Sequence, residues 1–90
     1  MPQQKTVITP IIHLNGDRAE TLIQRLEATW DMLDAAVTLL RDCAPNGRNY
    51  YPDPGRMEQA EQQYTRRQNQ IGDVMESLEA EIAAIQAQQR

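Results

Sequence analysis

Ninety residues are enough for one small domain, and a chain of this length buries a modest core that is often completed by association with further copies. It carries 13 acidic and 9 basic residues, a formal net charge of −4, which argues against a general DNA- or RNA-binding protein because such proteins present a basic face. Lys5 is the only lysine, so arginine, which can hold a phosphate in a two-pronged fork, supplies nearly all the positive charge.

The N-terminal segment, residues 1–14, is expected to be an extended arm. Val7, Ile8, Ile11 and Ile12 are β-branched, and Pro10 prevents a regular helix from running through them. The segment is too apolar to stay in solvent, so we expect it to lie along a helix of its own subunit or of a neighbour.

Residues 15–90 are predicted to be helical, with helices at about 18–43 and 54–87. Asp17 is the expected N-cap of the first helix, in a pattern like a capping box with Glu20. Pro45 ends that helix. Asp53 is the expected cap of the second helix, with Pro54 at its first position.

Both helices carry heptad-like apolar seams. The first seam is Ile23, Leu26, Trp30, Leu33, Val37 and Leu40. The second is Met57, Ala60, Tyr64, Arg67, Ile71, Val74, Leu78, Glu81 and Ile85, with Met75 and Ile82 beside it. The first helix has a further stripe, made of Leu22, Met32, Ala36 and Leu39. These patterns predict an all-α fold, an antiparallel two-helix hairpin with an extended N-terminal arm, which assembles into a homo-oligomeric helical bundle because one helix has two apolar stripes.

Arg67 is unusual because it falls on an apolar seam. A hairpin that places Leu40 near Met57 also places Trp30 near Arg67. The guanidinium can then lie over the indole as a cation–π pair, or it can project into a polar cavity and bind an anion. The sequence leaves both interpretations open.

The connection between the helices, "APNGRNYYPDPG" at residues 44–55, is rich in recognition chemistry. Its asparagine, proline and glycine residues suit turns and caps, which leaves Arg48, Tyr50 and Tyr51 without such a role. The tyrosines can pack over the open end of the hairpin. Alternatively, they stack on a base while Arg48 and Asn49 bond phosphate or a base edge.

The segment "HLNG" at residues 13–16 holds the other candidate site residues, His13 and Asn15. They can cap the first helix and anchor the arm, or they can bind polar edges of a ligand. This segment and the loop lie about one helix length apart in a hairpin, on the order of 35 Å. They can therefore share a site only between antiparallel subunits.

Other functional classes find little support in the sequence. His13 is the only histidine, which argues against a Cys/His metal site, and no nucleophile or cofactor motif accompanies it. We expect no enzyme activity, no cofactor and no metal. Cys43 is the only cysteine, and no segment resembles a membrane span or a signal peptide, so we expect a cytoplasmic protein.

"HLNG", "APNGRNYYP" and the charged second helix together resemble small proteins of bacteriophages and prophages that share the pattern HLNG–helix–APNGR(D/N)YY–helix. The resemblance covers residues 11–85, and "APNGRNYY" is its most specific part. A looser analogy, of architecture alone, links the chain to phage sponges, small helical oligomers that sequester cyclic nucleotide signals of host defence.

Two functional hypotheses follow. The first is a phage-encoded, non-enzymatic binding protein that sequesters a small anionic ligand, such as a cyclic nucleotide immune signal, in the cytoplasm of the infected bacterial host. Its inter-subunit site would comprise Arg48, Asn49, Tyr50, Tyr51, Arg67, His13 and Asn15. The second is a phage accessory coiled-coil protein that docks on a host or phage protein through its loop tip. Neither hypothesis involves DNA or a membrane.

Overall fold

The computed structural model describes residues 7–89, and every regular element in that range is helical. Helix α1 spans Ala19–Leu40 and continues into a 3₁₀ turn, Arg41–Cys43. The short helix α2 spans Gly47–Tyr50, and α3 spans Pro54–Ala87. The prediction of an all-helical protein is therefore confirmed for this range. Residues 1–6 of the predicted arm and Arg90 lie outside the described residues.

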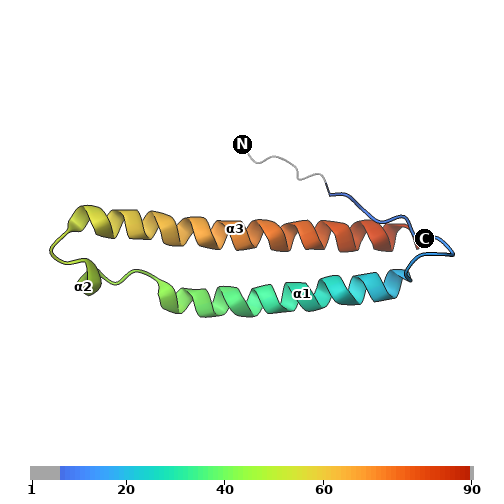
Figure 1. Ribbon diagram of the computed structural model, residues 1–90, viewed down its shortest axis with the longest axis horizontal. Coiled ribbons are helices and arrows are strands. Elements are labelled where there is room, and N and C mark those ends of the chain that lie inside the picture. The colour runs from blue at the N-terminus through green and yellow to red at the C-terminus, as the bar shows by residue number, and fades with distance from the viewer. Residues whose placement is uncertain (1–6, 90) are drawn as a thin grey trace.

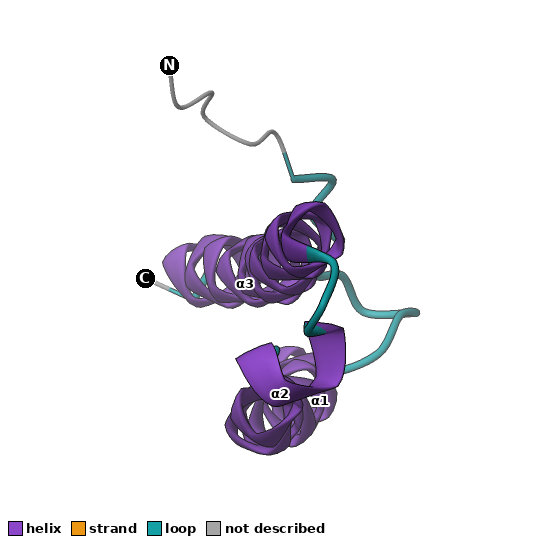
Figure 2. Cartoon of the chain, turned by 90° about the vertical axis from the view of Figure 1, so that its left-hand side faces the viewer, coloured by secondary structure: helices purple, strands orange, loops and turns teal. Residues whose placement is uncertain are grey.

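The two long helices, α1 and α3, lie side by side, and the chain runs along them in opposite directions (Figures 1 and 2). The molecule is elongated, with extents of 63 × 27 × 18 Å. The first turns of α3 extend past the C-terminal end of α1, and α2 lies there instead, against α3 (Figure 1). In the described part of the chain, no helix combines the length and the apolar character needed to cross a membrane.

The predicted heptad seam of α1 is half-buried at every position. Its central residue, Trp30, makes a direct link to α3, since the indole Nε1 donates a hydrogen bond to Glu79 Oε2 at 3.0 Å. The α1 seam is therefore the face that packs against α3.

The predicted seam of α3 was wrong in its middle. Arg67 is exposed, and the next residue, Gln68, is half-buried and donates from Nε2 to Tyr64 Oη at 3.1 Å. From there the half-buried line continues through Ile71, Met75, Leu78 and Ile82 to the buried Ile85. A step of four residues at Tyr64 brings Met75 and Ile82 onto the seam and leaves the Arg67 charge in water. Burial of the two apolar side chains and hydration of the charge both lower the free energy of the folded state.

The predicted pairing of Trp30 with Arg67 was also wrong, because Trp30 meets Glu79, several turns further along α3. The reason lies in residues 41–53. They form a 3₁₀ turn, an extended stretch and α2 rather than a tight reversal. Consequently α3 begins beyond the end of α1, and the register between the two helices shifts.

Of the two predicted caps, one is present. Asp53 Oδ1 accepts a hydrogen bond from the Arg56 amide at 3.1 Å, as expected for the N-cap of α3. At α1 the prediction was wrong, because the N-cap is Arg18 and makes no side-chain cap bond. Asp17 instead forms an ion pair with Arg25, its Oδ2 lying 3.5 Å from the arginine Nη1.

The described part of the arm is tied to Gln88, the C-cap residue of α3 in the same chain. The Gln88 side-chain amide donates from Nε2 to the Pro10 carbonyl at 2.8 Å and accepts from the Ile12 amide at 3.0 Å. One side chain thus pairs with the backbone on both sides of Ile11, and the Ile11 side chain stays exposed.

The core of the described chain is thin, because only Ala19 and Ile85 are buried. The chain exposes 7346 Å². A compact protein of 10.3 kDa exposes roughly 5,400 Å². On the face of α1 away from α3, Met32 is 72% exposed and Leu39 is 68% exposed.

Replacing the buried Ile85 with alanine should lower the free energy of unfolding by about 2–5 kcal/mol, because Ile85 is fully buried and its loss leaves a cavity. Val74→Ala on the same helix is the matched control. Val74 is 49% exposed, so its truncation should cost below about 1 kcal/mol. Urea unfolding at one fixed protein concentration measures both, and equal losses would contradict this assignment of the core.

Candidate functional site

The loop end of the molecule is built around α2, a helix that the sequence pattern did not predict. Asn46 caps it, with Oδ1 accepting from the Arg48 amide at 2.9 Å. The Tyr51 amide donates to the Gly47 carbonyl at 3.0 Å, and the Asp53 amide donates to the Tyr50 carbonyl at 2.7 Å. These bonds fix the backbone, so the loop side chains project from a defined helical turn rather than from a flexible connection.

Beside α2 lies an open groove of about 410 Å³, which we call the Tyr50 groove. Tyr50 is half-buried at its edge, and α3 supplies the rest of the lining. The residues are Tyr50, Arg56, Gln59, Ala60, Gln62, Gln63 and Arg66. The groove thus combines an aromatic ring, two guanidinium groups and three amides, which are the chemical groups that bind a base, a phosphate and polar base edges.

The two arginines of the Tyr50 groove differ in their surroundings. Arg56 Nε lies 3.7 Å from Asp53 Oδ2, and both side chains are exposed, so the pair contributes little to stability. Arg66 has no carboxylate partner among residues 7–89. Its guanidinium is therefore available to an anion.

Of the predicted loop residues, the structure places Tyr50 alone in the groove. Arg48, Asn49 and Tyr51 are exposed on and beside α2, and Tyr51 is 85% exposed. These three form the outer surface of the loop end, where they can meet a partner or the outer part of a ligand.

The predicted site did not include Arg56 or Arg66. Their spacing of ten residues puts them about a quarter turn apart on one side of a helix, which was the available sequence signal. The sequence could not show that α2 docks next to that side, because docking depends on the length of α3 that extends past α1 (Figure 1).

His13 and Asn15 lie at the opposite end of the molecule. The Gly16 amide donates to the His13 carbonyl at 3.2 Å and closes a turn. The imidazole lies so close to Gly16 that an added Cβ would stand 3.0 Å from Nε2. This turn borders an open cleft of about 690 Å³ between the arm, the start of α1 and Gln89.

Within one chain, the structure does not bring the predicted site residues together. Helix α1, of 22 residues and about 33 Å, separates the turn at His13 from the loop end. Arg67 is exposed on α3, outside the Tyr50 groove and away from Trp30. A site that contains both His13 and Arg48 therefore requires a second chain.

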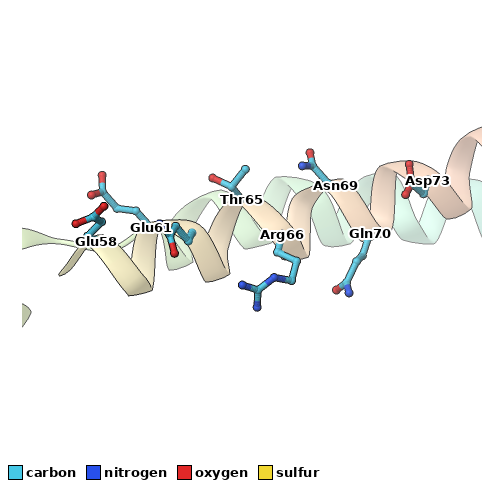
Figure 3. A pocket seen from close by; sticks show the side chains of 8 residues that line it. Glu58, Glu61, Thr65, Arg66, Asn69, Gln70 and Asp73 are labelled. Atoms are coloured by element: carbon cyan, nitrogen blue, oxygen red, sulfur yellow. The ribbon is translucent and has the colours of Figure 1, made fainter. Parts of the chain in front are cut away.

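Two other hollows have the wrong chemistry for an anion. The first hollow lies on the outer face of α3. All of its lining residues belong to that one helix, and their side chains point outward from it (Figure 3). Glu58, Glu61 and Asp73 line this face, and the side chain of Arg66, which this face shares with the Tyr50 groove, points away from Asp73 (Figure 3). A second hollow, of about 530 Å³, lies around Trp30 and is lined by three carboxylates, those of Glu27, Asp31 and Glu79.

Among residues 7–89, no group of three or more His, Cys, Asp or Glu side chains is arranged to hold a metal ion. Comparison of the chain with protein-family models, with curated proteins and with solved structures finds no match.

Asp53 supports the Tyr50 groove because it caps the helix that carries Arg56. Asp53→Ala should lower the free energy of unfolding by about 0.5–2 kcal/mol and speed hydrogen exchange at the Arg56 amide. Asp53→Asn should retain most of the stability, because the amide oxygen can still accept the capping bond. If both variants lose the same stability, the exposed ion pair with Arg56, rather than the cap, is what matters.

Proposed function

We propose that this protein is a non-enzymatic binding protein that sequesters a small anionic ligand, and that the ligand is a nucleotide signal of bacterial defence, cyclic nucleotides included. The observation that carries the proposal is the Tyr50 groove. There an aromatic ring and Arg66, which has no carboxylate partner among residues 7–89, lie beside Arg56 and three glutamine amides.

In this proposal each group in the groove has a role. Arg56 and Arg66 hold phosphate through forked hydrogen bonds. The Tyr50 ring stacks on a base, and the amides of Gln59 and Gln63 bond base edges. The outer loop residues Arg48, Asn49 and Tyr51 close over the part of the ligand that projects from the groove.

The proposed functional form is a homo-oligomer, an oligomeric helical bundle. The thin core of the single chain supports it, as do the exposed apolar side chains of Met32 and Leu39. A groove open on one side gains enclosure from a neighbouring subunit, and His13 and Asn15 of that neighbour can then reach the ligand. The protein should sediment as an oligomer at micromolar concentration.

The resemblance of "HLNG" and "APNGRNYY" to phage and prophage proteins supports a phage setting, and for the nucleotide-signal class the sponges provide an analogy of architecture alone. On this proposal the protein acts in the cytoplasm of the infected bacterial host. It removes the signal by binding it, so no catalytic residue is needed.

Thermal unfolding against a panel of linear and cyclic nucleotides tests the proposed function. A ligand present at a hundred times its dissociation constant should stabilise the protein by roughly 2.7 kcal/mol, a shift of several degrees for a domain of this size. The absence of a shift with every member of the panel would contradict the proposal.

Arg66→Ala and Arg67→Ala form a matched pair for locating the site. The two arginines are adjacent and both exposed, but only Arg66 lines the Tyr50 groove. Arg66→Ala should abolish the thermal shift, and Arg67→Ala should leave most of it. Arg48→Ala should also weaken binding without changing the oligomer. A loss confined to Arg67→Ala would place the ligand outside the groove.

A second function, docking on a host or phage protein, is favoured by the exposure of the loop tip. Tyr51 is 85% exposed at one end of an elongated helix pair, with Arg48 nearby, and tyrosine and arginine are common interface anchors. Capture of a specific host or phage protein that is lost in Tyr51→Ala, together with no thermal shift by nucleotides, would favour docking over ligand capture.

A further inference from the structure

The face of α1 away from α3 carries a continuous apolar stripe that nothing in the described chain covers. Ala28, Met32, Ala35 and Leu39 are all exposed. They follow one another at steps of four, three and four, so they form a single line along the helix. This line, the outer stripe, lies about half a turn from the seam that packs on α3.

We infer that the outer stripe is the contact between two copies of this chain, paired antiparallel about a two-fold axis at residues 33–34, and that this pairing builds the ligand site from the loop end of one copy and the His13 turn of the other. The inference rests on the proposed function and names the partner and the register of the same site.

The side-chain sizes select this register. With the axis at residues 33–34, Leu39 lies opposite Ala28 of the second copy, and Met32 lies opposite Ala35 of the second copy. Each pair of opposing residues along the outer stripe therefore combines a large side chain with a small one, which is the condition for close packing without voids. A parallel pairing in register would instead set Met32 against Met32 and alanine against alanine.

The charges beyond the outer stripe agree with the same register. The next layer places Arg25 opposite Asp42 of the second copy, and symmetry repeats the pair at the other end. At the positions that flank the stripe, no two like charges face each other. The facing residues, one from each copy, are Leu22 and Cys43, Thr29 and Ala36, and Asp31 and Thr38.

The exposed area is large enough for such a contact. The chain exposes 7346 Å², roughly 2,000 Å² more than a compact protein of its mass. A stable interface needs about 800 Å² from each partner. The two-fold pairing yields a row of four helices in the order α3, α1, α1, α3, with α1 covered on both apolar sides.

The register also joins the two ends that lie apart in one chain. Helix α2 lies beyond the C-terminal end of α1 and roughly in line with it (Figure 1). Antiparallel pairing about residues 33–34 therefore brings α2 to the level of the first turn of the second copy's α1. The turn from His13 to Gly16 immediately precedes that helix, so it lies at the same end of the dimer as the first copy's Arg48 and the rest of α2.

Cysteine cross-linking of the full chain tests the register without any ligand. In a Cys43→Ser background, the double variant Ala28→Cys/Leu39→Cys should form disulfide-linked dimers under mild oxidation. These two positions lie about 16 Å apart along one helix, too far for a bond within the chain. The matched control, Ala28→Cys/Thr38→Cys, should stay monomeric on a non-reducing gel, because residue 38 points about 100° away from residue 39.

The predicted approach of the loop end of one copy to the start of α1 in the other is tested with the double variant Arg18→Cys/Asn49→Cys. A bismaleimide, whose flexible spacer tolerates the irregular loop, should link two chains of this variant. Far-UV circular dichroism checks that each variant keeps its helices. Linkage in both designed pairs supports the inference. Absence of linkage in folded variants overturns it, and so does self-linkage of Ala28→Cys alone, which would indicate parallel helices.

Charge reversal gives an independent readout. Arg25→Glu or Asp42→Arg should each weaken the dimer about tenfold, since each turns two attractive pairs into repulsive ones. The double variant should restore wild-type association in sedimentation, although Arg25→Glu also removes the contact with Asp17. No restoration overturns the register. These experiments need no ligand, whereas the nucleotide panel on the wild-type chain tests the proposed function alone.

Discussion

The whole structure depends on one line of side chains, the seam between α1 and α3. The described chain has no sheet and no third long helix to enclose a core. Half-buried residues along this seam therefore supply nearly all the apolar burial. The hydrogen bond from Trp30 to Glu79 also specifies how the two helices align, because a slip by one helical turn would break it. The placement of α2, and with it the Tyr50 groove, follows from that register.

Each helix seam was predictable to the extent that its apolar pattern is continuous. The α1 seam could be predicted because every one of its positions is apolar. The α3 seam could not, because a polar run interrupts it and the step of three to Arg67 competes with the step of four to Gln68. The step of four is selected only because it places Met75 and Ile82, further along the helix, on the buried side. The cap at Asp53 was predictable because proline follows it, whereas Asp17 had Arg25 as a competing partner.

The candidate site shows the same limit. The loop composition pointed to Arg48, Asn49, Tyr50 and Tyr51, of which only Tyr50 lines the groove. The distance between the loop and His13 followed from helix geometry alone. The identity of Arg56 and Arg66 as groove residues did not follow, because it requires knowing that residues 47–50 fold into a helix and dock on α3. Local sequence specified the chemistry of this end of the molecule, and long-range packing decided which side chains share a surface.

The clamp that Gln88 places on the arm has a consequence for the order in which the molecule can form. Gln88 follows Ile12 by 76 residues, so during synthesis the arm leaves the ribosome well before the residue that holds it. Until then the backbone groups of Pro10 and Ile12 lack this hydrogen-bond partner. The arm therefore docks late, because its docking requires that α3 and the residue after it have been made and that α3 is aligned beside α1.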